Sequence, residues 1–410
     1  MKYVKLKDII SITHGYAFKG EFFSDDEQKY VLVTPGNFNI GGGFKTDKLR
    51  YYSGEVPKKY ILRKDDVIIT MTDLSKSADT LGHSAKIPTM KNKIFLHNQR
   101  IGKINKKSEL INLDFIYWLM RTKKFHEFVI GSASGSTVKH TSPNRVLEYE
   151  FDLPEIGKQK AIVSVLSSFD DKIERLEKQN KSLEKIGEAL FKQWFVNFEF
   201  PNKNGKPYAS SGGKMVYNKD LGKEIPAGWE VKSGKNLFNF VKGKPSPIVD
   251  SSAVQDAVPQ VLIENLSGGD TVFVDPGKAV LVEKMDTLMV MDGASSGVVS
   301  IGQKGALGST LAKMDFKNSD LSCIIYNFLK RHESFIRYNN TGSSIPHANK
   351  SLIFQLMISL PKNEKDLKPL ANQLAIFIQK QLKNKPQIQS LKQTRDLLLS
   401  KLMSGKIRVN

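Results

Sequence analysis

The chain has 410 residues, of which 40% are hydrophobic, and this is enough for two or three domains with packed cores. A single cysteine, Cys323, excludes an intrachain disulfide, and no apolar run reaches the roughly 18 residues that a membrane span needs, so we expect a cytoplasmic protein. The 62 basic and 42 acidic residues leave a net charge of +20, which favours a polyanionic partner, although the charge could also be incidental.

The first part of the chain contains short β-branched and aromatic runs with turn residues between them, a pattern typical of strands. These runs are Tyr30–Pro35, Asp65–Thr70 and Lys93–Ile104. An apolar periodicity then predicts a helix over Leu113–Gly131. The loop GSASGSTVKH (131–140) follows, and a last strand ends at Leu153 and Pro154.

A glycine run lies between the first two of these strands, in GNFNIGGGF (36–44). Glycines allow a backbone to approach DNA closely, but they are also common in flexible hairpins. The sequence leaves both interpretations open.

After Leu153 and Pro154 the apolar period lengthens toward 3.5 residues, which predicts a helix of roughly 40 residues, about 60 Å long. A connection rich in glycine, proline and lysine follows at 198–230. The second part of the chain repeats the order of elements. Its expected strands are Pro259–Leu266, Lys278–Lys284 and Asp286–Gly293, its expected helix is Asp320–Tyr338, and its loop is NTGSSIPHAN (340–349).

The two parts match residue by residue, and this indicates an internal duplication. Gly135 aligns with Gly342 at an offset of 207 residues, and the same offset aligns His140 with His347. The strand Asp65–Met71 matches Met285–Met291 at an offset of 220, and the long helices match at 208.

Each long helix carries an apolar seam that must be buried. A helix could cover its own domain, but two matching long helices favour packing against each other. An antiparallel arrangement sets Asn180 opposite Asn384, and Pro386 predicts a kink or break nearby. The residues expected to pair are Leu166, Phe169, Ile173, Asn180, Leu183, Leu374, Phe377, Asn384, Leu391 and Leu398.

The sequence contains no recognisable catalytic constellation. It has no phosphate-binding G-x-x-x-x-G-K-[ST] loop, no N-P-P-[FY] tetrad for base methylation and no metal-ligand spacing among its seven histidines. We therefore expect a binding protein with no cofactor or metal of its own.

The order of segments resembles the specificity subunit of type I restriction-modification systems. The resemblance covers nearly the whole chain, including HGYAFKGEFF near the start, FEFPNKNGKPYASSGGKM and IPAGWE at the centre, and LLLSKLMSGKI at the end. It implies an α+β fold of two mixed α/β target-recognition domains, each followed by a long helix, with the helices forming an antiparallel coiled-coil spacer of pseudo-two-fold symmetry. The expected boundaries are recognition domain 1 at 1–157, helix 1 at 158–197, a linker at 198–225, recognition domain 2 at 226–365 and helix 2 at 366–410.

The resemblance further implies a non-catalytic subunit that binds a bipartite double-stranded DNA target, one half-site per recognition domain. Two adenine-N6 methyltransferase subunits would bring S-adenosylmethionine. Two motor-nuclease subunits would bring ATP and magnesium.

Candidate DNA contacts follow from residue chemistry, because hydroxyl groups suit phosphates while amides, lysine and arginine suit base edges. In the first domain they are Lys19, Asn37, Asn39, Lys45, Lys76, Ser136, Thr137, Lys139 and His140. In the second they are Lys242, Lys244, Asn265, Ser295, Ser296, Ser343, Ser344 and His347. The repeated loop residues favour phosphate positioning or closure of the fold, whereas Lys19, Asn37 and Asn39 lie where the copies diverge and favour base reading.

Two other hypotheses stay open at this point. One is an enzyme with an unrecognised motif, which would act on DNA without a partner. The other is a coiled-coil interaction scaffold with incidental charge, which would show no preference for one DNA sequence.

Overall fold

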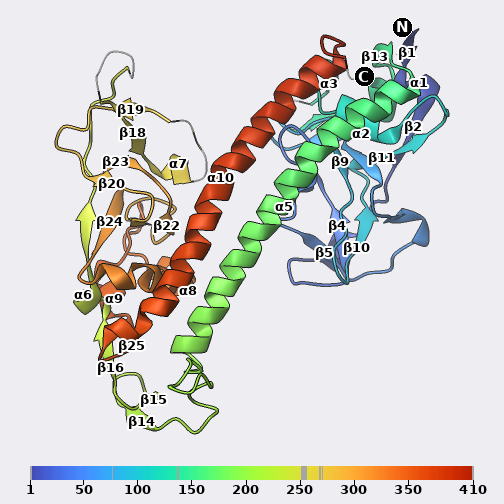
Figure 1. Cartoon of the computed structure of the whole chain (residues 1–410). Coiled ribbons are helices and arrows are strands. Elements are labelled where there is room, and N and C mark those ends of the chain that lie inside the picture. The colour runs from blue at the N-terminus through green and yellow to red at the C-terminus, as the bar shows by residue number, and fades with distance from the viewer. Residues whose placement is uncertain are drawn as a thin grey trace. The chain divides into compact units, whose positions relative to one another are not determined.

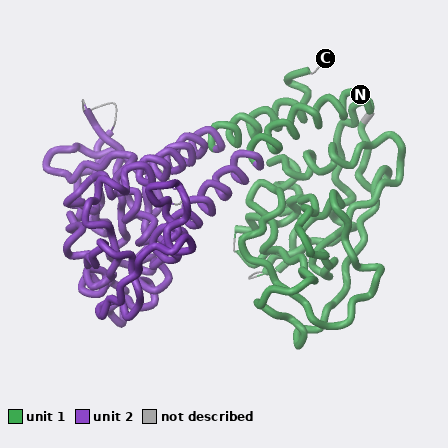
Figure 2. Tube along the Cα trace, turned by 60° about the horizontal axis from the view of Figure 1, so that its bottom comes forward, with its two compact units in different colours: residues 1–173, 389–410 green, residues 174–388 purple. Residues whose placement is uncertain are grey.

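In the computed structural model, the chain is described at residues 2–75, 77–135, 138–250, 256–266, 269 and 271–408. It consists of two compact units, residues 1–173 with 389–410 and residues 174–388 (Figure 2). We call them unit 1 and unit 2. Each unit contains a mixed α/β domain and one part of each of two long helices, so the two mixed domains and helical spacers expected from the sequence are confirmed.

Unit 1 is built around a four-stranded antiparallel sheet in the order β2-β11-β7-β9. A second sheet, β3-β5-β4-β10-β6, contains one parallel pair, β10 with β4. The bounds of these strands are β2 Ile10–His14, β3 Phe23–Ser24, β4 Tyr30–Val33, β5 Arg50–Tyr52, β6 Ile61–Leu62, β7 Val67–Thr70, β9 Ser84–Lys86, β10 Ile94–His97 and β11 Ile101–Lys106. Two short ladders complete the unit, β1 (Lys2–Lys5) with β13 (Glu150–Leu153) and β8 (Thr72–Asp73) with β12 (Lys139–His140).

Unit 2 repeats the order of the antiparallel sheet, while its mixed sheet has four strands among the described residues where that of unit 1 has five. Its antiparallel sheet has the order β17-β24-β21-β22, and its mixed sheet β19-β18-β23-β20 has the same kind of parallel pair, β18 with β23. The bounds are β16 Trp229–Ser233, β17 Phe238–Lys242, β18 Val258–Val261, β19 Phe273–Val274, β20 Leu281–Val282, β21 Thr287–Val290, β22 Val299–Ile301, β23 Gly305–Leu307, β24 Leu311–Phe316 and β25 Met357–Pro361. The duplication in the sequence is therefore a duplication of the fold.

The expected helix over Leu113–Gly131 is two helices, α2 (Leu113–Leu119) and α3 (Lys123–Gly131). Thr122 separates them, because its hydroxyl accepts a hydrogen bond from Phe125 N and so caps a new helix. In unit 2, Tyr326 matches Tyr117, and Arg331 therefore takes the place of Thr122. Arginine is not a favoured N-cap residue, and α8 (Ser322–Tyr338) is one continuous helix. Shorter helices are α1 Leu6–Ile9, α4 Pro143–Leu147, α6 Gly234–Leu237, α7 Ile263–Leu266 and α9 Lys350–Gln355.

Two further segments differ from what the sequence predicts. The strand expected over Pro259–Leu266 ends at Val261, because Asn265 Oδ1 accepts a hydrogen bond from Leu262 N and starts the helical turn α7. The segment expected to be a linker contains a hairpin, β14 (Met215–Asn218) with β15 (Lys223–Pro226). It also contributes Phe198 and Phe200 to an aromatic cluster with Trp229, so it has packed side chains of its own.

The two long helices are α5 (Ile156–Phe195) and α10 (Lys368–Met403) (Figure 1). The sequence predicted a kink or a break at Pro386. The helix does not break there, since α10 continues through Pro386. Proline removes one backbone hydrogen bond and costs about 3 kcal/mol or more in a helix interior, and packing on both sides of Pro386 offsets this cost. In unit 1, Leu166 packs in a cluster with Leu399 and Leu402. In unit 2, Phe191 packs in a cluster with Leu374.

Polar residues interrupt the seam between α5 and α10 in unit 2. Asn384 is buried, and its Nδ2 donates to Asn180 Oδ1 at 2.8 Å and to Gln179 Oε1 at 3.0 Å. Gln381 Nε2 donates to the carbonyl of Asn180 at 3.3 Å. Asp170 on α5 contacts Arg395 on α10, and Asn180 contacts Asn384. The contacted residue number falls along α10 as it rises along α5, so the helices are antiparallel. All ten residues expected to pair are buried or half-buried.

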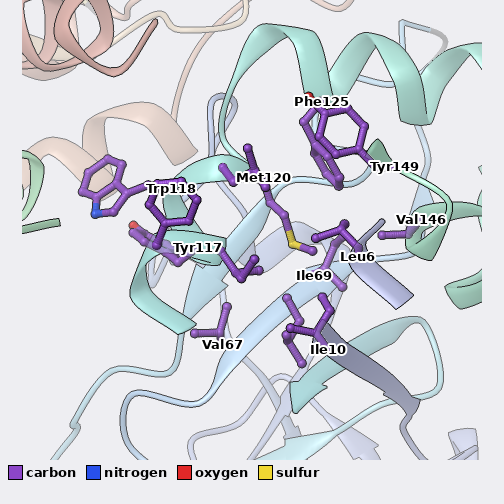
Figure 3. Close-up of a cluster of buried hydrophobic side chains, with 14 of the residues drawn as sticks. Leu6, Ile10, Val67, Ile69, Tyr117, Trp118, Met120, Phe125, Val146 and Tyr149 are labelled. Carbon is purple, nitrogen blue, oxygen red and sulfur yellow. The ribbon is translucent and has the colours of Figure 1, made fainter. Parts of the chain in front are cut away.

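The largest core of unit 1 joins the antiparallel sheet to its helices (Figure 3). Leu6 at the start of α1, Ile10 from β2 and Ile69 from β7 pack in one cluster with Met120 and Phe125 from the helical segment, and all are buried. The strand β7, after which the candidate site lies, is anchored in this core through Val67 and Ile69.

Candidate nucleic-acid interface

The two glycine and serine loops share one backbone feature, a glycine with positive φ at the matching position. Gly135 has φ +97° and Gly342 has φ +89°, a region that disfavours L side chains. A Cβ at Gly135 would overlap the carbonyl oxygen of Val138, and a Cβ at Gly342 would overlap that of Ile345. The repeated glycine therefore closes a tight turn in each unit.

Each loop returns to its sheet at the same place. Thr141 N donates to Met71 O at 3.0 Å in unit 1, and Ala348 N donates to Met291 O at 2.8 Å in unit 2. Just beyond these bonds the loop pairs with the residues that follow the central sheet strand, His140 with Thr72 and His347 with Asp292. We call residues 72–73 with 134, 135 and 138–140, and residue 292 with 341–347, the histidine ribbons. Each ribbon places one exposed histidine beyond the edge of its sheet.

The histidine has a different partner in each ribbon. In unit 1, His140 Nδ1 lies 3.2 Å from Thr72 Oγ1. In unit 2, His347 Nδ1 lies 2.8 Å from Asp292 Oδ1, and Lys242 Nζ lies 3.0 Å from the other carboxylate oxygen. Burial raises the pKa of the Asp292 carboxyl, but His347 and Lys242 outweigh burial and hold that pKa below its ordinary value.

The charged group of unit 2 borders a shallow pocket of about 370 Å³. Lys242, His347, Asn349 and Lys350 line it together with Asp292. Cationic side chains can bind a phosphate there, whereas a carboxylate can accept a hydrogen bond from a cytosine amino group. The pocket thus offers groups for both the backbone and the base edges of DNA.

The structure leaves most of the candidate DNA contacts accessible. Lys19 is exposed and lies 3.8 Å from Glu21, while Asn39 and Lys45 lie on the loop of the glycine run. Exposed or half-buried candidates are Lys19, Asn39, Lys45, Lys139, His140, Lys242, Lys244, Asn265, Ser295, Ser343, Ser344 and His347. His140 and Lys139 come together in one ribbon, as do His347, Ser343 and Ser344 in the other. Lys76, Ser136 and Thr137 lie outside the described residues.

Two candidates are unavailable for DNA contact because they close loops. Asn37 is fully buried, and its side chain bonds to Thr34 N and to the carbonyls of Lys45 and Lys48. Ser296 is also fully buried, and its hydroxyl lies within hydrogen-bond distance of the carbonyls of Gly293 and Pro346. Both expectations are therefore corrected.

Sequence reasoning missed two exposed aliphatic residues, one next to the ribbon of unit 1 and one within the ribbon of unit 2. Leu74 is 65% exposed in unit 1, and Ile345 is 58% exposed in unit 2. Leu74 lies in a turn that Asp73 fixes, since the Asp73 carboxylate accepts hydrogen bonds from Ser75 N and Thr80 N at 2.7 and 2.6 Å. Exposed aliphatic groups among polar loop residues suit contact with thymine methyl groups. The signal in the sequence was an apolar residue within each polar loop.

Two further findings concern other classes of site. Within the described ranges, no group of three or more histidine, cysteine, aspartate or glutamate side chains is placed to hold a metal ion. Among the helices of those same ranges, none combines the length and apolarity needed to cross a membrane.

Comparison with known proteins agrees with the duplicated fold. Residues 1–185 match the family model of the type I restriction modification DNA specificity domain. The chain is 30% identical over 329 residues to the type I restriction enzyme MjaIX specificity subunit of Methanocaldococcus jannaschii, which covers 76% of this chain and 73% of that protein. It is 22% identical over 378 residues to the HindI specificity subunit of Haemophilus influenzae, covering 74% and 79%.

A solved structure shares the fold. The type I restriction-modification S subunit from M. genitalium matches with a TM-score of 0.61 at 17% identity, covering 98% of this chain and 96% of that one. The chain therefore belongs to the family of type I restriction enzyme specificity subunits, the DNA-recognition rather than catalytic components of these systems.

Proposed function

We propose that this chain binds a bipartite DNA target, one half-site per unit, and directs adenine-N6 methylation and restriction by partner subunits. The observation that carries the proposal is the histidine ribbon, which recurs at the same edge of the same sheet in both units. Two copies of one binding device in a single chain suit the two halves of a split target. The net charge of +20 supports a nucleic-acid partner.

The two half-sites differ in base sequence under this proposal. The two ribbons share a glycine of positive φ and the same pairing of the histidine with the end of the sheet strand, which suits contacts to phosphates that are the same in any DNA. Their side chains differ, because a neutral Thr72 stands where unit 2 has the Asp292 carboxylate paired with Lys242. Groups that differ between the units are therefore the ones that discriminate between bases.

The partners follow from the family and not from this chain alone. Two methyltransferase subunits would bind S-adenosylmethionine, and two motor-nuclease subunits would bind ATP and magnesium. Each of the paired helices α5 and α10 follows one recognition domain in sequence and is unbroken, which suits a shared platform for such partners. The chain itself supplies recognition in this assembly.

Selection from a random duplex library tests the proposal on the full-length chain. We expect the bound DNA to share two short blocks separated by a constant gap. Asp292→Asn should alter base preference in one block only, and Thr72→Val should alter it in the other block only. Each variant is thus the control for the other.

The alternatives predict different selections. An interaction scaffold enriches no sequence, and a single recognition site enriches one block without a fixed gap. Either result would overturn the bipartite proposal. Methyl transfer or cleavage by the purified chain without partners would support the enzyme hypothesis instead.

A further inference from the structure

Arg121, two residues after the end of α2, has a guanidinium that is almost completely buried and connects three segments of unit 1. Its side chain is 2% exposed. Nε donates to the carbonyl of Gly41 at 2.9 Å, in the loop of the glycine run. One terminal nitrogen donates to Tyr117 Oη at 2.6 Å and to Asp170 Oδ2 at 2.8 Å, on α5.

The network continues from α5 to α10. Asp170 Oδ1 accepts a hydrogen bond from Arg395 at 2.5 Å, so one carboxylate bridges two guanidiniums. Burial raises the pKa of Asp170, but the charges of Arg121 and Arg395 outweigh burial and hold that pKa below its ordinary value. The carboxylate is therefore ionised at neutral pH, and both arginines have a partner.

The glycine run is shaped to lie on Arg121. Gly41, Gly42 and Gly43 all have positive φ, at +80°, +88° and +95°. A Cβ at Gly42 would lie 2.5 Å from Arg121 Cγ, so a side chain at this position would push the loop off the arginine. The loop turns back at this contact and leaves Asn39 exposed and Ile40 74% exposed. Arg121 thus fixes the base of a loop whose tip faces solvent.

Among the residues of unit 2 that the structure describes, the positions equivalent to Arg121 and Asp170 form no matching network. Tyr326 matches Tyr117, and four residues later Lys330 takes the place of Arg121. Lys330 Nζ pairs with Glu333 at 2.8 Å on its own helix. At the helix offset of 208, Ile378 takes the place of Asp170 and lies in the apolar core. A role for this network is therefore specific to the first recognition domain.

We infer that Arg121 is a positioning residue for the first half-site, because it fixes the 39–45 loop against the paired helices so that Asn39 and Ile40 meet the base edges in one geometry. The inference rests on the proposed function. Any partner that alters the spacing of α5 and α10 at Asp170 and Arg395 would act on the loop through this same network.

The test compares variants of the full-length chain. Arg121→Lys keeps the charge but loses the planar group that reaches Gly41, Tyr117 and Asp170 together. Gly42→Ala displaces the loop without removing the arginine. Lys330→Met is the matched control in unit 2. Binding is measured to duplexes carrying single-base changes in either half-site and to unrelated DNA.

We expect Arg121→Lys and Gly42→Ala to reduce discrimination at the first half-site about tenfold, the range of one good base contact. Discrimination at the second half-site and affinity for unrelated DNA should stay at wild-type values. Lys330→Met should leave the first half-site unchanged. A general loss of stability could not produce this pattern, because it would weaken unrelated DNA binding as well.

Three outcomes would overturn the inference. One is unchanged discrimination in both variants, and another is an equal loss at both half-sites. The third is loss of all DNA binding by Arg121→Lys while Gly42→Ala has no effect, which would make the arginine only a structural residue. If the wild-type chain shows no sequence preference at a first half-site, the proposed function is wrong instead. Failure of the inference and failure of the proposed function are therefore distinguishable.

Discussion

Acidification should destabilise unit 1 through His83. This side chain is buried, and it stacks on His126 with ring centroids 4.2 Å apart. Its Nδ1 has no hydrogen-bond partner among the described residues. Burial, with the nearby His126 and Arg121, lowers the pKa of His83 from 6.5 to about 4. The folded state therefore holds a neutral histidine that the unfolded chain would protonate.

The sign and size of the effect follow from linkage. Because the folded-state pKa is depressed, the contribution of His83 is complete above pH 6.5 and is lost as the pH falls toward 4. A shift from 6.5 to about 4 corresponds to a loss of about 2 kcal/mol by pH 5.0 and about 3 kcal/mol at lower pH. The loss is a substantial part of the stability of a typical domain.

The assay is urea unfolding at pH 7.5 and at pH 5.0. Trp118 is the one tryptophan of unit 1, so replacing Trp194 and Trp229 by phenylalanine makes its fluorescence a reporter of that unit. His83→Phe retains a ring against His126 but cannot titrate. Between the two pH values, the wild-type background should lose about 2 kcal/mol more than His83→Phe.

The comparison has an internal control. His97 is also buried with a lowered pKa, but it is present in both proteins and cancels in the difference. An equal loss of stability in wild type and His83→Phe would refute the reasoning.

Three further predictions concern the helix seam and the interface. Asn384→Leu should destabilise unit 2 by about 1–3 kcal/mol, because it removes the donor to Asn180, and adding Asn180→Leu should recover part of that loss in a double-mutant cycle. Gly342→Ala should cost about 1–3 kcal/mol in loop geometry and weaken DNA affinity, since the added Cβ overlaps the carbonyl of Ile345; unchanged affinity would exclude the loop from the interface. Lys244→Glu should reduce the slope of log affinity against log salt by about one, measured by fluorescence anisotropy.

Repetition made much of the fold predictable from the sequence. The offset of 220 that aligned Met71 with Met291 also aligns β7 with β21, and the offset of 207 aligns the two ribbons. Polar residues in an apolar seam were equally informative, because a buried Asn384 needs a partner at a similar height on the facing helix, and Asn180 supplies it.

The individual interface residues were less predictable because residue type does not reveal burial. Asn37 has the chemistry of a base-reading amide, yet its bonds to the backbone of its own loop use that chemistry internally. In the sequence, Arg121 belongs to a segment with a helical pattern, and nothing there indicates its role. Its partners Gly41 and Asp170 are distant in sequence. Whether such a residue is buried or exposed to solvent is decided by contacts between segments that are distant in sequence.

The most direct test of the central claim is a map of N6-methyladenine in host DNA, read by single-molecule sequencing with this gene intact and deleted. We expect methylation at a two-part motif with a fixed gap in the intact strain, and its loss in the deletion strain while the methyltransferase subunit is still expressed. Methylation of the same motif in both strains, or loss at a motif of a single block, would contradict the account.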